Sequence, residues 1–336
     1  MSWQGIEGHD ETVAKLRTAW QQGRLGSAYL LTGPSGIGKR HLAHALAQTL
    51  LCDRPSPEFA PCGQCESCRL FSSGSHPDFL RVACEEDQRV LPLELLIGER
   101  QHRTREGLCF WISLAPVHAH RKIAILEDAD LLAEEGANAL LKTLEEPPIG
   151  SVLFLISHNL QRQLPTIRSR CQILFCPPLD VPTLARLIQN QGLAPTPQEA
   201  ERLAEWSAGS LEVARELADP AWAEFLGELE RLLARQPVDS VEIGREVAAF
   251  VDQAGESVPA KRSRLRQVVR LVSESLRQQL RQAVMHSDAE AIQWELMRQI
   301  DHCMLVMQQI DANAHLPTLI DAWTEALAGT RLAAVW

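Results

Sequence analysis

A seven-residue segment in the first fifth of the chain has the residue types and spacing of a loop that holds phosphate groups. Gly33, Gly36 and Gly38 let backbone N–H groups converge on phosphate oxygens, and Lys39 would reach the outer phosphates. An apolar run, Tyr29–Leu31, precedes the glycines, and a helical pattern of leucine and alanine follows the lysine. A strand, a glycine-rich turn and a helix in this order form the context of a phosphate-binding loop (P-loop), so the sequence predicts a P-loop here.

Arg40 departs from the P-loop pattern at the next position. The pattern has Ser or Thr there because the hydroxyl oxygen binds Mg²⁺, and a guanidinium group offers no oxygen ligand. Two other uses of this side chain remain open. Its positive charge would either contact a phosphate or take the place of the metal ion. The binding of ATP and Mg²⁺ is therefore doubtful, although the shape of the loop is expected.

The candidate metal ligands are four thiols in one short stretch: Cys52, Cys62, Cys65 and Cys68. Two consecutive C-x-x-C steps with a fourth thiol nearby suit a tetrahedral Zn²⁺ site. An iron–sulfur cluster fits less well because the run lacks the further cysteine and proline of the bacterial ferredoxin pattern. Four unliganded thiols are the remaining alternative. No histidine or water-binding position is evident, so we predict a structural Zn²⁺ that holds the insert at about 52–68.

Two adjacent carboxylates, Glu127 and Asp128, follow the apolar run Ile123–Leu126. Such a run bounded by acids is typical of a buried parallel strand. Ligands of parallel α/β sheets lie at the carboxyl ends of the strands. Because the P-loop also follows a strand, we expect the two acids and Lys39 to lie at the same edge of one sheet.

These groups need a particular set of elements to position them. Strands alternate with helices through residues 1–178, which predicts a parallel sheet with helices on both faces. The strand signal ends after Pro178. Residues 179–219 have the pattern of a small helical domain, and residues 220–336 have long amphipathic helices that predict an all-α domain.

Composition limits the class of protein. The 336 residues carry a formal net charge of −10, which argues against broad, non-specific binding of nucleic acid. The N-terminus lacks a signal pattern, and no apolar run is long enough to span a membrane. We therefore expect a cytoplasmic protein with no membrane partner.

Two segments relate the chain to a known family. Residues 140–148 read Leu-Leu-Lys-Thr-Leu-Glu-Glu-Pro-Pro, and residues 169–171 read Ser-Arg-Cys. Together with the P-loop and the four-cysteine insert, they resemble bacterial clamp-loader subunits of the AAA+ family. The resemblance implies an AAA+ domain, a helical lid and a helical collar used for oligomerisation. It also implies a subunit of the DNA polymerase III clamp loader, with the gamma/tau and delta subunits, the sliding clamp and primer–template DNA as partners.

The same resemblance implies a degenerate ATP site. Active relatives have Asp then Glu after the strand, whereas this chain has Glu127 then Asp128. The sensor-1 position falls at Ser157 or His158. The sensor-2 arginine would lie in the segment 209–212, where Glu212 would repel phosphate. Arg215, one turn later, is the only nearby substitute. With Arg40, these changes predict that the chain does not hydrolyse ATP itself.

Arg170 has a different role in this family. The arginine of Ser-Arg-Cys acts in the ATP site of the neighbouring subunit, as an arginine finger in trans. We therefore predict Arg170 as the catalytic residue of this chain. The alternative for Arg170 is a side chain that hydrogen-bonds carbonyl groups at the start of a strand.

Three functions compete at this stage. The first is a non-catalytic, stator-like clamp-loader subunit that supplies Arg170 to a neighbour. The alternative is a hydrolysing gamma/tau-like AAA+ subunit whose motifs have drifted. An unrelated P-loop enzyme, such as a small-molecule kinase, is the third. The segments 140–148 and 169–171 argue against the kinase, and Arg40 favours the first function over the second.

Overall fold

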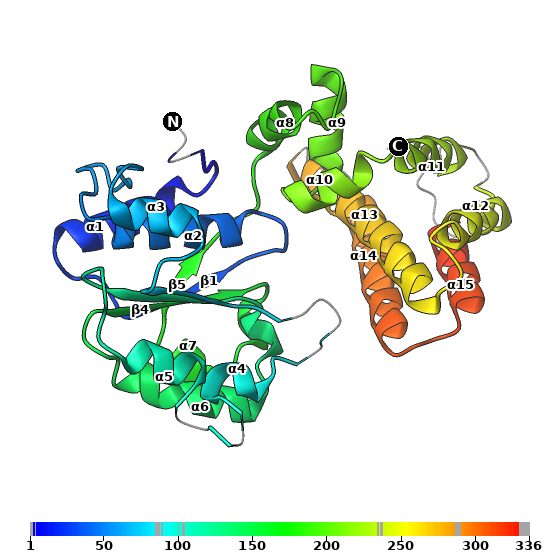
Figure 1. Cartoon of the computed structure of the whole chain (residues 1–336). Coiled ribbons are helices and arrows are strands. Elements are labelled where there is room, and N and C mark those ends of the chain that lie inside the picture. The colour runs from blue at the N-terminus through cyan, green and yellow to red at the C-terminus, as the bar shows by residue number, and fades with distance from the viewer. Residues whose placement is uncertain are drawn as a thin grey trace. The chain divides into compact units, whose positions relative to one another are not determined.

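The structure is a computed structural model that describes residues 3, 5–84, 88, 90–99, 101–102, 105–233, 235, 238–285 and 290–328. The chain divides into two compact units (Figure 1). The first comprises residues 1–184 with 209–212, and the second comprises residues 185–208 with 213–336. The three-part division at 178 and 219 expected from the sequence stays a prediction.

The first unit is built on a five-stranded parallel sheet. Its strands are β1 (Ala28–Thr32), β2 (Phe79–Val82), β3 (Lys122–Leu126), β4 (Ser151–Ser157) and β5 (Gln172–Phe175). Their order across the sheet is β2-β3-β4-β1-β5. Strand β4 therefore lies between the strand that leads into the P-loop and the strand that leads into the two acids. The carboxyl ends of these three strands bring the P-loop and the two acids to one edge.

Helices cover the sheet on both faces (Figure 1). One face carries α1 (Asp10–Gln21), α2 (Lys39–Leu51) and α3 (Glu66–Ser72). The other carries α4 (Leu93–Ile97), α5 (Gly107–Ser113), α6 (Glu134–Glu145) and α7 (Pro165–Arg168). Two short 3₁₀ turns, η1 (Ala129–Leu131) and η2 (Leu160–Arg162), follow β3 and β4.

Alternation of side chains along the strands explains why both faces are covered. Leu31 and Phe154 lie in the hydrophobic cluster beneath α1–α3, whereas Leu30 and Leu155 lie in the cluster beneath α4–α7. Strands that bury both faces read as continuous apolar runs, as β1 and β4 do. The predicted α/β P-loop fold, with helices on both sides of a parallel sheet, is confirmed.

The remaining helices are α8 (Val181–Asn190), α9 (Pro197–Trp206), α10 (Leu211–Leu217), α11 (Pro220–Leu233), α12 (Ser240–Asp252), α13 (Val258–Met285), α14 (Glu290–Asp311) and α15 (Leu316–Ala328). The core of the second unit contains an aromatic group in which the ring of Phe250 stacks on Phe225 at 4.1 Å between centroids. Trp222 meets Phe250 edge-on at 4.6 Å. Nearby on α13, Arg262 donates hydrogen bonds to the carbonyl oxygens of Ile310, Asn313 and Ala314. The last carbonyl groups of a helix lack intrahelical donors, so Arg262 stabilises the end of α14.

The predicted helical character of the C-terminal part of the chain is confirmed. Across the part of the chain that the structure describes, none of the helices combines the length and apolar composition needed to cross a bilayer.

Candidate functional site

The glycines of the P-loop allow close approaches by other backbone and side-chain atoms. Gly33 directly follows β1, and a Cβ at this position would lie 2.1 Å from the carbonyl oxygen of Cys176. Gly36 has a φ of 72°, and a Cβ there would lie 2.1 Å from Oγ of Ser210. Gly38 has a left-handed backbone and comes directly before α2. The loop therefore has the strand–turn–helix shape that the sequence predicts.

The ammonium group of Lys39 is directed toward carbonyl groups of the same loop. Nζ donates to the carbonyl oxygen of Gly33 at 2.7 Å and to that of Pro34. The side chain is buried, and burial lowers the pKa of Lys39 to about 8 despite the opposing charge of Asp130. Lys39 therefore holds the backbone of the loop in its turn.

Arg40 contacts both acids that follow β3. Its Nε lies 3.0 Å from Oε2 of Glu127, and its Nη2 lies 3.1 Å from each carboxylate oxygen of Asp128. The sequence left two uses open for this guanidinium, contact with a phosphate or replacement of the metal charge. Its contacts in this structure are with the two carboxylates, which in active relatives would support Mg²⁺ and polarise water.

Glu127 is held by a second arginine that sequence reasoning missed. Arg81 on β2 donates through Nε at 2.6 Å and through Nη2 at 3.1 Å to the two oxygens of Glu127. The Glu127 carboxylate is only 2% exposed, so it lies between two guanidinium groups with little access to water. Such charge-assisted, two-point hydrogen bonds fix the orientation of a carboxylate. The register that pairs Arg81 with Ile125 brings its side chain near the end of β3.

His158 occupies the space between the P-loop lysine and the second acid. Its Nδ1 lies 3.3 Å from Nζ of Lys39, and its Nε2 lies 3.3 Å from Oδ1 of Asp128. A neutral imidazole with its proton on Nε2 satisfies both contacts, accepting from Lys39 and donating to Asp128. The hydrogen bond from His158 and the charge of Arg40 lower the pKa of Asp128, despite the burial of its carboxyl group. Of the two sensor-1 candidates, His158 faces the loop.

Ser157, the other sensor-1 candidate, is directed to Asp130. Its Oγ donates to Oδ1 of Asp130 at 2.7 Å. Asp130 also accepts from the backbone N–H groups of His158 and Asn159 and from Nε2 of Gln163. The sequence analysis gave Asp130 no role, although it is the third acid after β3. Its carboxylate fixes the turn that carries His158, so it positions the site indirectly.

Residues 209–212 lie against the P-loop. The N–H of Leu211 donates to the carbonyl oxygen of Gly36 at 3.0 Å, and Oγ of Ser35 donates to Oε2 of Glu212 at 3.0 Å. A carboxylate thus contacts the loop in the segment where the family resemblance predicts a sensor-2 position. Arg215 donates instead to Oε1 of Gln191, through Nη2 at 2.9 Å and Nε at 3.1 Å.

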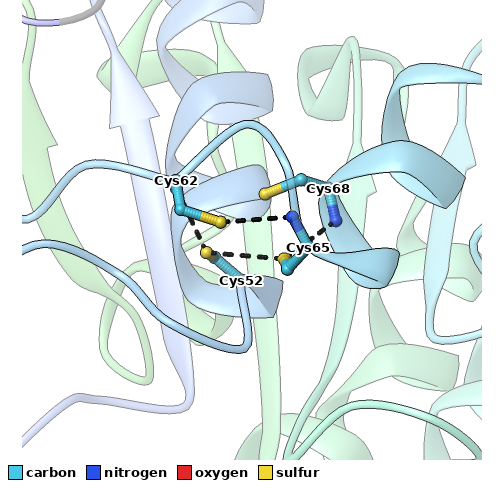
Figure 2. Close-up of side chains that lie close together, drawn as sticks. All are labelled: Cys52, Cys62, Cys65 and Cys68. Atoms are coloured by element: carbon cyan, nitrogen blue, oxygen red, sulfur yellow. Dashed lines mark hydrogen bonds between the residues drawn. The ribbon is translucent and has the colours of Figure 1, made fainter.

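The four predicted metal ligands come together at the ends of two helices (Figure 2). Cys52 follows the last residue of α2, and Cys65 caps the start of α3. The ligand sulfurs all lie within 4.8 Å of one another. Four thiols at this separation form a cluster that could hold one metal ion.

Backbone N–H groups also point at the sulfur atoms. The N–H groups of Cys62 and Cys65 donate to Sγ of Cys52 and Cys62, each at 3.3 Å. The N–H of Cys68 donates to Sγ of Cys65 at 3.4 Å. Hydrogen bonds from the N–H groups of Gln64 and Cys65 lower the pKa of the Cys62 thiol to about 6, whereas burial raises the pKa of the Cys52 and Cys68 thiols. Since thiolates are the form that binds metal, this donor set fits a thiolate-bound ion.

Arg170 lies at the surface between α7 and β5. Its Nε donates to Oε1 of Glu145 at 2.8 Å, and its Nη1 donates to the carbonyl oxygen of Thr166 at 3.0 Å and to Oγ of Ser169 at 3.1 Å. The carbonyl contact expected under the alternative interpretation is therefore present. The side chain is still 32% exposed, and none of its hydrogen bonds to described residues involves the P-loop. The guanidinium thus belongs to a second cluster of polar residues in this unit, separate from the one around the P-loop.

Comparison with known sequences decides the family. The family described as "DNA polymerase III, delta subunit" matches residues 8–180, just over half of the chain. The chain belongs to this family. The matched region contains the P-loop, the cysteine cluster, the two acids and Arg170. The resemblance to clamp-loader sequences is therefore confirmed for the part of the chain in which its motifs lie.

Individual members of the DNA polymerase III group are similar as well. The chain is 41% identical over 186 residues to the DNA polymerase III subunit delta' of Pseudomonas aeruginosa, covering 54% of this chain and 53% of that protein. It is 35% identical over 167 residues to the delta' subunit of Escherichia coli, covering 49% and 46%. With the tau subunit of Escherichia coli it shares 29% identity over 263 residues, covering 76% and 39%. The matched part spans about half the length of the delta' relatives.

A solved structure resembles the chain over most of its length. It is that of a DNA polymerase III gamma subunit-related protein from Thermotoga maritima, with a TM-score of 0.43 and 16% identity, covering 95% of this chain and 99% of that one. The fold of this delta subunit family member is therefore described from its own strand order and P-loop geometry, as given above.

We expect Arg40 and Arg81 to stabilise this delta-family fold through Glu127. Replacing either arginine with alanine removes one partner of a buried carboxylate. We expect a loss of about 1–2 kcal/mol in the free energy of unfolding. The loss is no larger because both guanidinium groups are about half exposed, so that water screens their charge. The double variant should lose more than the sum, because the carboxylate is then buried without a cation. Urea denaturation of the four proteins measures this coupling.

Alanine at the exposed Arg24 is the matched control and should leave the free energy of unfolding unchanged. Additive losses from the two arginine variants would show that Glu127 does not couple them.

Proposed function

We propose that this chain is a subunit of the DNA polymerase III clamp loader that does not hydrolyse ATP itself. In this proposal it acts as a stator-like member of the assembly and supplies Arg170 to the ATP site of a neighbouring subunit. The observation that carries the first part is the position of Arg40, whose guanidinium contacts both Glu127 and Asp128.

The chemistry of phosphoryl transfer explains why this contact matters. Hydrolysis needs a hydroxyl oxygen and a carboxylate to hold Mg²⁺, and a second carboxylate to orient water. Here a guanidinium replaces the hydroxyl, and its charge already balances both carboxylates. Lys39 donates to carbonyl groups of its own loop, and Glu212 brings a further negative charge to that loop. Each of these features opposes the binding of Mg²⁺ and of the outer phosphates.

Arg170 supports the second part of the proposal. It lies outside the P-loop network, on the surface, in the Ser-Arg-Cys segment that resembles the finger of clamp-loader subunits. An arginine stabilises the charge that develops on the transferred phosphoryl group, and it can be supplied from another subunit. Its five N–H donors and fixed plane suit contact with phosphate oxygens.

The proposal includes a cofactor and partners. The cofactor is one structural Zn²⁺ bound by the four clustered thiols. The partners are the gamma/tau and delta subunits, and within the assembly the sliding clamp and primer–template DNA. The compartment is the cytoplasm, where replication takes place. Residues 179–219 would form the lid, and residues 220–336 would form the collar through which the subunits associate.

An exposed apolar stripe on α14 supports a subunit contact in the second unit. Trp294, Met297, Met304 and Leu305 recur at helical spacing and are between 45% and 68% exposed. Exposed apolar side chains aligned on one helix face are uncommon on a monomer and typical of a protein interface. We assign this face to contact with the helical domain of another clamp-loader subunit.

An ATPase assay of the purified chain tests the catalytic part of the proposal. We expect no release of phosphate from ATP above background, alone or with primed DNA, because the Mg²⁺ ligands are engaged by Arg40. Lys39→Ala provides the matched control and should have the same background rate. Clear turnover that Lys39→Ala abolishes would instead support the hydrolysing gamma/tau-like function.

A further inference from the structure

The side chain of Glu145 contacts the guanidinium group of Arg170. Glu145 is the last residue of α6, and Arg170 follows the end of α7. Its Oε1 accepts the hydrogen bond from Nε of Arg170 at 2.8 Å and also forms an ion pair with Nη2. The two residues are 25 positions apart in the sequence, so the fold alone brings them together.

The contacts of Arg170 engage all three nitrogens of its guanidinium. Glu145 accepts from Nε, while Thr166 and Ser169 accept from Nη1. Nη2 forms an ion pair with the same oxygen of Glu145, so each of the three nitrogens has a partner. Because a guanidinium is planar, contacts with Glu145 on one side and with Thr166 and Ser169 on the other fix its plane.

We propose that Glu145 is a positioning residue for Arg170, orienting the guanidinium toward the active site of the neighbouring subunit. This inference rests on the proposed function of Arg170 as a finger in trans. Glu145 does not touch the nucleotide in this scheme. It limits the rotamers of a long, one-third-exposed side chain, so that less freedom is lost when Arg170 meets the phosphate.

Because the Glu145–Arg170 pair is partly exposed, we expect it to orient the guanidinium more than it stabilises the fold. The Glu145 side chain is 49% exposed, and exposed ion pairs contribute little to the folding free energy because water and salt screen them. We therefore expect substitutions of Glu145 to change catalysis in the complex without changing the melting temperature of the chain.

The test uses the complex reconstituted with gamma/tau and delta subunits, with kcat and KM for ATP measured separately. Glu145→Ala should lower kcat by roughly three- to tenfold with KM unchanged, because a misdirected guanidinium stabilises the transition state less. Glu145→Gln should restore most of the rate, since its amide oxygen can accept the same hydrogen bond. Glu146→Ala, which changes the adjacent exposed carboxylate, is the matched control and should have no effect.

A double variant establishes the route of the effect. Arg170→Ala combined with Glu145→Ala should have the rate of Arg170→Ala alone, because Glu145 acts only through Arg170. An unchanged or increased rate for Glu145→Ala, with Arg170→Ala still impaired, would overturn the positioning role and leave the finger intact. An unimpaired Arg170→Ala would overturn the finger and this inference with it.

Discussion

Alanine at Arg170 is expected to slow ATP hydrolysis in the adjacent subunit's site by about 10³- to 10⁵-fold, the range found for arginine fingers. The expected loss is large because a guanidinium supplied in trans neutralises charge that exists only in the transition state. The measurement is single-turnover hydrolysis in a complex in which only the adjacent site is able to bind and hydrolyse ATP. The isolated chain should show no corresponding change, since its own site is not expected to turn over.

Two matched variants make this result specific. Arg168→Ala removes an exposed arginine two positions earlier, at the end of α7, and should leave the rate unchanged. Arg170→Lys keeps the charge but not the planar set of donors, so it should recover only part of the rate. Equal rates for wild type and Arg170→Ala in an intact complex would remove the finger from the proposed function.

Removal of the zinc ligands is expected to have the second large effect, on stability. Structural Zn²⁺ sites in small domains contribute apparent binding free energies of about 10–16 kcal/mol, and part of this is folding free energy. Cys65 is buried at the start of α3, and its sulfur lies 3.8 Å from that of Cys52. We expect Cys65→Ala to lose the metal and to lower the free energy of unfolding by several kcal/mol, about 3 or more.

Metal analysis and urea denaturation test this expectation together. The wild-type chain should contain about one zinc ion, and a strong chelator should reproduce the instability of Cys65→Ala. Cys109→Ser is the control, because Cys109 lies outside the cluster, with its sulfur near the carbonyl oxygen of Ala139. A wild-type chain that is folded and contains no metal would refute the zinc site.

Local patterns predicted a large part of this molecule. The glycines before Lys39 predicted the turn after β1 because few residue types tolerate such close approaches. The spacing of Cys62, Cys65 and Cys68 predicted their convergence because a C-x-x-C step at a helix start turns both sulfurs to one side. In each case the residues that form the feature are close in the sequence.

Features made by distant residues were not predictable in the same way. Arg81 reaches Glu127 across 46 positions, and only the pairing of β2 with β3 brings them together. An arginine in an apolar run gives no sign of its partner. The contact between Glu145 and Arg170 was not predictable for the same reason, because the end of α6 approaches the end of α7 only in the folded unit.

The choice between Ser157 and His158 shows a different limit. Every residue of β4 is buried, so its sequence has no alternation to indicate which side chain faces which side. The structure settles the directions through Asp130, whose carboxylate takes the hydroxyl of Ser157 and the backbone N–H of His158. His158 is then left to face Lys39. A polar side chain that carries no motif of its own thus sets which of the two neighbouring side chains faces the P-loop.

Arg40 and Arg170 together have a consequence for self-assembly. One arginine balances the acids beside the chain's own P-loop, and the other lies at the surface, 32% exposed. Under the proposed function, two adjacent copies would place Arg170 of one copy at an ATP site that does not bind Mg²⁺. A ring made only of this chain would therefore not hydrolyse ATP. The chain would therefore function only in a hetero-oligomer with active ATPase subunits. There its own inactive site would end the series of active sites, so the two ends of that series would differ.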